Sequence, residues 1–168
     1  GHVDSVIDSN GDAHEAEFVG IAVGLNYNTE FLEDTPVELD DGIVVDQYMQ
    51  TDVEDVYAAG DITKYHDVIL EDQTQNGAWG SAKEQGIVAG KNMIADDTVK
   101  EFRYVPSYSI THFDFPFLSF GHPTIGDDEA ERKYSDDEWR RLTFNNGKLV
   151  GGVLIGDLSQ QSTFKKII

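Results

Sequence analysis

The sequence predicts an α/β domain followed by a small α+β domain. Short apolar stretches and one helical stretch alternate over the first 95 residues, as they do in α/β folds. From residue 102 onward, aromatic residues crowd into a short span and an Asn-Gly pair separates two apolar runs, which is typical of antiparallel strands. Polar residues near 96–101 interrupt both patterns, so we expect two domains, residues 3–98 and 102–168.

Three strands are expected in the first domain. Residues 17–23 (EFVGIAV) form a short apolar run that ends at Gly24, and residues 42–46 (GIVVD) are rich in β-branched side chains. The third apolar run, residues 56–59 (VYAA), stops at Gly60. Short apolar runs of this kind are expected in the sheet of an α/β fold.

A helix is expected over residues 81–94. Ser81 is followed three residues later by Glu84, which is the pattern of a capping box at a helix N-terminus. One face of this helix repeats at helical spacing and is mostly small, with Ala82, Gly86, Ala89 and Met93. A small face lets the helix approach a sheet or a flat ligand closely, and we expect this to outweigh the helix propensity lost at Gly86 and Gly90.

The second domain is expected to be rich in β-structure. Its crowded aromatic residues suit half-buried strands and are Phe102, Tyr104, Tyr108, Phe113, Phe115, Phe117 and Phe120. Residues 141–144 and 148–155 flank an Asn-Asn-Gly sequence at 145–147, which is a strong signal for a hairpin. A short helix is expected in the tail, over residues 159–168.

The composition argues against several classes of protein. The chain has 32 acidic and 12 basic residues, a formal net charge of −20, and nucleic-acid binding is not expected because phosphate contacts need clustered Lys and Arg. Since molar salt screens such a surface within about 3 Å, the charge indicates the cytoplasm of a salt-accumulating halophile, with an acidic mesophile as the alternative. No apolar run is long enough to span a membrane, so no membrane association is expected.

Metal and thiol chemistry are also not expected. The chain contains no cysteine, so disulfides, thiolate nucleophiles and zinc–thiolate sites are excluded, and any redox chemistry must come from a bound cofactor. The residues His14, His66 and His112 show no metal-ligand spacing. Pairs of acidic residues are interpreted as a solvated surface and not as a metal site.

The stretch VYAAGD places a carboxylate, Asp61, directly after an apolar run and a glycine, Gly60. Open α/β sheets bind ligands at the carboxyl ends of their strands. A lone carboxylate accepts hydrogen bonds from hydroxyl groups but repels phosphate, so it suits a ribose or ribityl chain better than a pyrophosphate. Gly60 would let the ligand lie against the backbone. A simple turn or helix cap is the alternative for this Gly-Asp pair.

Three segments carry a resemblance to a known family. They are GLNYNTEFL (24–32), GIVVDQYMQTDVEDVYAAGD (42–61) and WGSAKEQGIVAGKNM (79–93). In this order and spacing, over residues 17–95, they resemble the second half of the FAD domain in the pyridine nucleotide-disulfide reductase family. The resemblance is greatest to its ferredoxin, rubredoxin and nitrite reductase-like branches. The implied fold is part of a Rossmann-like FAD-binding domain.

The resemblance implies roles for four residues in cofactor binding. Asp61 is similar to the family aspartate that accepts the ribityl hydroxyl of FAD, and Gly60 would allow close approach. Trp79 and Gly80 are similar to residues at the start of the helix beside the isoalloxazine ring, where the helix N-terminus can stabilise negative charge. For Trp79, an ordinary core aromatic is the alternative.

Further positions follow from the same resemblance. Gln85 and Gly86 would face the domain interior. Two positions depart from the family pattern, with Tyr27 in place of a proline and Asp52 in place of a small residue. These departures put the contacts on the nicotinamide side in doubt more than those to the flavin.

The C-terminal part is similar to the third, α+β domain of the same branch. The similarity lies in FPFLSFG (115–121) and LVGGVLIGD (149–157), and in these families the domain serves as an interface or as a lid near the flavin. The sequence GHPT is similar to the motif that carries a catalytic histidine in disulfide reductases. That chemistry needs a cysteine pair, so we interpret His122 as a turn residue.

The sequence contains no G-x-G-x-x-G motif, although the family carries two such motifs ahead of the region matched here. We therefore expect the chain to be a C-terminal piece of an FAD-dependent NAD(P)H oxidoreductase, inactive alone. Its expected partners are the missing N-terminal part, an electron-carrier protein and a second copy, because an uncovered sheet edge invites pairing. The alternative is a non-catalytic module for dimerisation or for docking an electron carrier.

Overall fold

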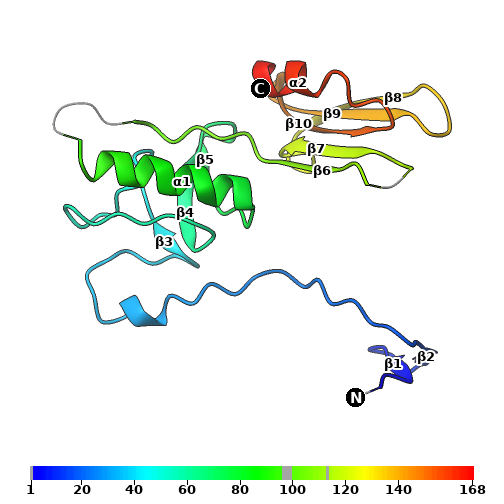
Figure 1. Ribbon diagram of the computed structural model, residues 1–168, viewed down its shortest axis with the longest axis horizontal. Helices are drawn as coiled ribbons and strands as arrows, with labels where there is room; N and C mark the ends of the chain where they lie inside the picture. The colour runs from blue at the N-terminus through cyan, green and yellow to red at the C-terminus, as the bar shows by residue number, and fades with distance from the viewer. Residues whose placement is uncertain (1, 96–99, 113) are drawn as a thin grey trace.

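The computed structural model describes residues 2–95, 100–112 and 114–168 of the chain. Its strands form three sheets (Figure 1). A small antiparallel pair, β1 (Ser5–Ile7) and β2 (Ala13–Glu15), lies apart from the rest of the molecule. An extended segment with one short 3₁₀ helix, η1 (Glu30–Leu32), connects this pair to the first body.

The first body combines a three-stranded sheet with the long helix α1 (Trp79–Asn92). The strands are β3 (Ile43–Val44), β4 (Thr63–Asp67) and β5 (Asp72–Thr74), in the order β3-β4-β5. The β3 and β4 strands are parallel, whereas β4 and β5 are antiparallel.

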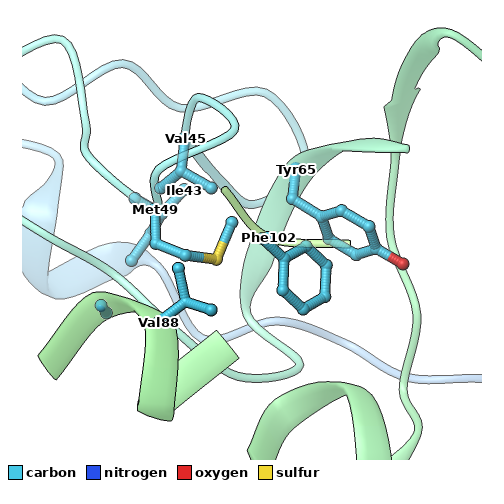
Figure 2. Close-up of a cluster of buried hydrophobic side chains, with 7 residues drawn as sticks. Ile43, Val45, Met49, Tyr65, Val88 and Phe102 are labelled. Atoms are coloured by element: carbon cyan, nitrogen blue, oxygen red, sulfur yellow. The ribbon is translucent and has the colours of Figure 1, made fainter. Parts of the chain in front are cut away.

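The core of the first body lies between this sheet and α1 (Figure 2). Met49 and Val88 are fully buried, and Tyr65 meets Phe102 edge to face with ring centroids 5.1 Å apart. Phe102 comes from the segment after α1, and its backbone N–H donates to the carbonyl of Gln47 at 2.7 Å. The segment after α1 therefore completes the core of the first body.

The second body is a five-stranded antiparallel sheet in the order β6-β7-β10-β9-β8. Its strands are β6 (Ser107–Ile110), β7 (Phe117–Gly121), β8 (Asp128–Lys133), β9 (Trp139–Asn145) and β10 (Lys148–Ile155). The C-terminal helix α2 (Gln161–Ile167) packs on β7, where Phe164 stacks on Phe120 at 5.6 Å between centroids. The fold class, a partial Rossmann-like α/β body with a small C-terminal sheet domain, is confirmed.

The hairpin and the tail helix predicted from the sequence are confirmed. The β9 and β10 strands pair across the turn, with Asn145 opposite Lys148. Asn146 and Gly147 both have positive φ, at 51° and 74°, which is the backbone conformation that favours Asn-Gly in a two-residue hairpin turn. The tail helix spans most of the predicted segment.

The aromatic span is only partly strand. Phe117 and Phe120 lie in β7 and Tyr108 lies in β6, as expected. Phe102 and Tyr104 lie in irregular structure instead, because they pack on the core of the first body. The prediction for Phe113 lies outside the described residues.

Two of the three strands predicted for the first body are wrong. Residues 42–46 contain β3, but residues 17–23 form no strand, and residues 56–59 contain only an isolated bridge from Tyr57 to Gln50. A strand requires hydrogen bonds to a neighbour, and no such partner lies beside residues 17–23 in the described chain. Their side chains are accordingly exposed, with Phe18 at 88%.

The predicted helix exists, but its start and its buried face differ from the prediction. It begins at Trp79 after the N-cap residue Ala78, and Ser81 lies buried inside the first turn and does not cap it. The buried face consists of Ser81, Gln85, Val88, Ala89 and Asn92. Gly86 and Met93 are exposed, so the expectation that Gly86 faces the interior is wrong. Polar side chains occupy the interior because they find hydrogen-bond partners there.

Two glycines are predicted to respond oppositely to alanine substitution. A Cβ at Gly152, in β10, would lie 2.7 Å from the Arg141 carbonyl oxygen and 2.8 Å from the Phe120 ring, so Gly152→Ala is expected to cost about 1–3 kcal/mol. A Cβ at Gly86, in α1, would meet no atom within 4 Å, so Gly86→Ala is expected to stabilise by about 0.5–1 kcal/mol. Thermal unfolding of both variants measures the difference. Equal melting temperatures would contradict this description of the packing.

Among the described residues, no helix has the length and apolar character needed to cross a membrane.

Candidate functional site

The loop of Gly60 and Asp61 lies directly before β4 and is fixed to α1. Gly60 has a φ of +104°, a conformation that strongly favours glycine, and the space where a Cβ would stand is open to 4 Å. Its backbone N–H donates to Gln85 Oε1 at 2.7 Å. The loop therefore has a defined conformation and leaves its outer side free for a ligand.

Gln85 is the centre of a buried polar network under this loop. The side chain is fully buried, and Oε1 accepts a second hydrogen bond, from the Thr63 hydroxyl at 2.7 Å. Nε2 donates to Ser81 Oγ at 3.2 Å. Thr63 Oγ1 also lies 2.9 Å from the Gly60 carbonyl oxygen. The expectation that Gln85 faces the interior is therefore correct.

The Asp61 carboxylate is exposed and, within the described residues, makes no hydrogen bond. It does not cap its own backbone. The pKa of the Tyr108 hydroxyl on β6 is raised, first by burial and then by the nearby Tyr104 and Asp61. The negative charge of Asp61 therefore acts on Tyr108. The same hydroxyl donates to Asn76 Oδ1 at 2.8 Å. Asp61 therefore lies near Tyr108 of the second body.

The start of α1 lies against Tyr104, in the segment between α1 and β6. Tyr104 stands so close to Gly80 that a Cβ there would overlap its hydroxyl, so a side chain at this position would displace the tyrosine. The N-cap residue, Ala78, has no side chain that could satisfy the free N–H groups of the first turn. These N–H groups and the positive end of the helix dipole are suited to a ligand that carries negative charge.

Trp79 is 78% exposed, which excludes the core aromatic that was the alternative for this residue. Lys83 Nζ lies 5.2 Å from the centroid of its ring, within the range of a cation–π contact. The indole ring is thus available on the surface at the start of α1.

Tyr65 is a further polar group at this place that sequence reasoning missed. The residue is 1% exposed, and among the described residues its hydroxyl has no hydrogen-bond partner in good geometry. Burial, followed by the negative charge of Asp67, raises the pKa of Tyr65 to about 12, while Ser81 and Asn76 act in the opposite direction. The phenol is therefore neutral at physiological pH and lies below the first turn of α1.

A period of two along β4 could have identified this residue. Thr63, Tyr65 and Asp67 are buried, while Lys64 and His66 between them are less so. This alternation is typical of a strand with one buried face, but the buried positions are polar and the apolar pattern does not reveal them.

His122 is a turn residue, as predicted, because the N–H of Ile125 bonds to its carbonyl oxygen at 3.3 Å. Sequence reasoning missed the role of its side chain. Nε2 lies 2.8 Å from Asp67 Oδ2, and the Asp67 side chain is completely buried. Within the described residues, no group of His, Asp and Glu could hold a metal ion.

The family model "Pyridine nucleotide-disulphide oxidoreductase" matches residues 1–86. The chain belongs to this family. Residues 106–168 match the model "Rubredoxin NAD+ reductase C-terminal domain", so the second body of this family member has a known counterpart.

Two curated relatives and one solved structure show how far the similarity extends. The chain is 30% identical over 182 residues to "Pyridine nucleotide-disulfide oxidoreductase domain-containing protein 1" of Pongo abelii, covering 95% of this chain and 35% of that protein. It is 26% identical to the NADH-rubredoxin oxidoreductase of Clostridium acetobutylicum, covering 99% of this chain and 42% of that protein. The fold resembles that of a ferredoxin reductase from Rhodopseudomonas palustris, with a TM-score of 0.82 at 20% identity, over 96% of this chain and 40% of the other.

The chain thus spans roughly a third to two fifths of the length of these two curated relatives. The family and the fold are established for this part of the relatives' length.

Proposed function

We propose that the chain is part of an FAD-dependent NAD(P)H oxidoreductase that passes electrons from a nicotinamide cofactor through the flavin to an acceptor. The observation that carries this proposal is the position of Asp61, a free carboxylate on a loop that is hydrogen-bonded to α1. Family membership supports the same activity, since the Clostridium relative is an NADH-rubredoxin oxidoreductase.

The residues present fit a flavin. Gly60 leaves open space beside the backbone, the first turn of α1 has no side-chain cap, and Trp79 offers an exposed ring. Asp61 would hold the ribityl hydroxyl groups, and Trp79 and Gly80 would lie beside the isoalloxazine ring. When bound, FAD would take a hydride from NAD(P)H and supply the electron transfer.

The protein's own residues bind and orient in this proposal. The ionised Asp61 accepts hydrogen bonds from hydroxyl groups, and Gln85 keeps the Gly60 backbone in place so that the carboxylate stays oriented. The free N–H groups of the first turn of α1 stabilise negative charge. Tyr104 lies against Gly80 at the start of the helix, and Tyr108 donates a hydrogen bond to Asn76 Oδ1 in the segment before it.

Several finer points belong to the same proposal. We place the domain division at residues 98–102. We expect the protein to work in the cytoplasm of a halophile. We also expect it to work as a homo-oligomer, together with the regions that its longer relatives have and this chain lacks. The acidic composition and the exposed apolar run at residues 17–23 support these points. A monomer by light scattering in molar salt would count against the homo-oligomer.

The second candidate, a module that docks an electron carrier, is favoured by the distribution of charge. Residues 128–168 carry seven basic and seven acidic residues, whereas residues 1–127 carry five basic and 25 acidic residues. An acidic carrier protein would be repelled by the first part and tolerated by the second.

Addition of FAD to the purified chain separates the two candidates. A protein that elutes from gel filtration with flavin absorbance supports the oxidoreductase. A colourless protein that still binds an acidic carrier or a second copy supports the docking module instead.

A further inference from the structure

One polar contact between the two bodies is buried. Asp67, the last residue of β4, is 1% exposed, and its Oδ2 accepts a hydrogen bond from His122 Nε2 at 2.8 Å. Because a carboxylate only accepts hydrogen bonds, Nε2 carries the proton. The polar contacts Lys148–Glu71 and Tyr108–Asn76 join the same two bodies at the surface.

The two carboxylate oxygens of Asp67 accept hydrogen bonds from different places, one from the following turn and one from the second body. Oδ1 accepts the backbone N–H groups of Ile69 at 2.8 Å and Leu70 at 3.0 Å, which leaves Oδ2 for His122. Tyr65 on the same strand also faces this carboxylate, and Glu71 follows in the turn with its N–H 2.8 Å from the Asp67 carbonyl oxygen. The first body therefore presents a fixed and fully oriented acceptor.

The second body fixes the donor equally well. His122 follows directly after β7, and its backbone N–H donates to the Val150 carbonyl of β10 at 2.8 Å. A Cβ at Gly151 would overlap the His122 backbone, so only glycine allows β10 to approach this closely. The backbone of His122 is thus held by two strands of the five-stranded sheet.

We propose that His122 and Asp67 form a positioning clasp that seats the five-stranded sheet on β4 and thereby holds Tyr108 beside Asp61. The connection between the two places is short: β7 ends at Gly121 and pairs with β6, where Tyr108 lies opposite Ser119. Movement of His122 away from Asp67 would carry this strand pair, and with it Tyr108, away from Asp61. The consequence for flavin binding rests on the proposed function, whereas the clasp itself does not.

The clasp is tested by the distance between the two bodies without any flavin. Since the chain has no cysteine, Lys91→Cys on α1 and Glu131→Cys on β8, both exposed, accept nitroxide labels specifically. Pulsed electron–electron double resonance on labelled chain diluted with unlabelled chain reports the distance within one molecule. Wild type is expected to give one narrow distance distribution.

Two substitutions at His122 differ only in reach. Glutamine places its amide nitrogen near the position of imidazole Nε2 and can donate to Asp67, whereas asparagine stops short of it. His122→Gln is expected to retain the narrow distribution, and His122→Asn is expected to lose it while the far-UV circular dichroism stays unchanged. His14→Asn, in the exposed His14–Asp8 pair at 3.1 Å, is the control and is expected to change nothing.

The double variant Asp67→Asn/His122→Asn covers the case in which His122→Asn fails to fold. It buries no charge and keeps an oxygen for the Ile69 and Leu70 N–H groups, so it is expected to fold and to lose the narrow distribution too. A narrow distribution in either folded asparagine variant would overturn the proposal, as would equal broadening in His122→Gln. Because flavin is absent, neither result depends on whether the chain binds FAD.

Discussion

Replacing Asp67 by alanine is expected to lower the free energy of unfolding by about 3–5 kcal/mol, because hydrogen bonds to a buried charged group contribute about 1.5–3 kcal/mol each. The change removes the acceptor for His122 and leaves the N–H groups of Ile69 and Leu70 without their side-chain partner. Denaturant unfolding monitored by circular dichroism measures the loss.

Asp8 provides a matched control for this substitution. Its Oδ1 accepts the N–H groups of Asn10 and Asp12, and its Oδ2 lies 3.1 Å from His14, so the chemistry is the same as at Asp67. The Asp8 side chain is 36% exposed, so water can replace the lost contacts there. Asp8→Ala is therefore expected to be far less costly, and an equal loss in both variants would show that burial is not what makes Asp67 important.

The contribution of Asp67 is also expected to depend on pH. Burial alone would raise the pKa of Asp67, but the hydrogen bond from His122 and those from Leu70 and Ile69 outweigh it, so the pKa lies below its usual value of 3.8. A carboxyl with a lowered pKa in the folded state stabilises the protein above its unfolded pKa and loses that contribution as the pH falls through the folded pKa.

The difference in unfolding free energy between wild type and Asp67→Asn measures this contribution. It is expected to shrink as the pH falls below about 4, because both chains share the other carboxyl groups. A difference that stays constant down to pH values at which wild type unfolds would contradict the assignment.

Replacing Gln85 by leucine is expected to cost about 2–4 kcal/mol, equivalent to a fall in melting temperature of about 5–15 °C. The substitution leaves the buried N–H of Gly60 and the Thr63 hydroxyl without their shared acceptor. The Gly60–Asp61 loop is expected to become mobile, because this acceptor is what joins it to α1.

Gln161→Leu on the exposed first turn of α2 is the control for this substitution. Thermal unfolding of the two variants makes the comparison, and amide hydrogen exchange at Gly60 reports the loop directly. Unchanged protection of the Gly60 amide in Gln85→Leu would show that the network does not hold the loop.

The elements that the sequence predicts correctly depend on local chemistry. The turn at residues 145–147 requires positive φ angles that Asn and Gly adopt readily, so the hairpin follows from a few neighbouring residues. Residues 17–23 have the apolar pattern of a strand but no strand partner among the described residues. A strand depends on its neighbour, and the sequence of the strand alone does not supply it.

In the candidate site, too, the residues of a local motif could be predicted and the long-range contacts could not. The family motif locates Gly60, Asp61 and the start of α1, and the structure brings the loop and the helix together through Gln85. The pair of Asp67 and His122 is separated by 55 residues, and no local pattern connects them. The small residues of α1 suggested a buried face, whereas the face that is buried carries the amide side chains of Gln85 and Asn92. Asn92, for example, donates to the Tyr48 carbonyl at 2.8 Å.

Titration of FAD with wild type, Asp61→Ala and Glu54→Ala, followed by flavin fluorescence, tests directly whether Asp61 holds the flavin. Wild type and Glu54→Ala are expected to bind FAD with equal affinity. Asp61→Ala should bind about 10- to 100-fold more weakly, since a charge-assisted hydrogen bond contributes about 1.5–3 kcal/mol. Equal affinity of Asp61→Ala and wild type, or no change in FAD fluorescence with any of the three, would contradict this role of Asp61.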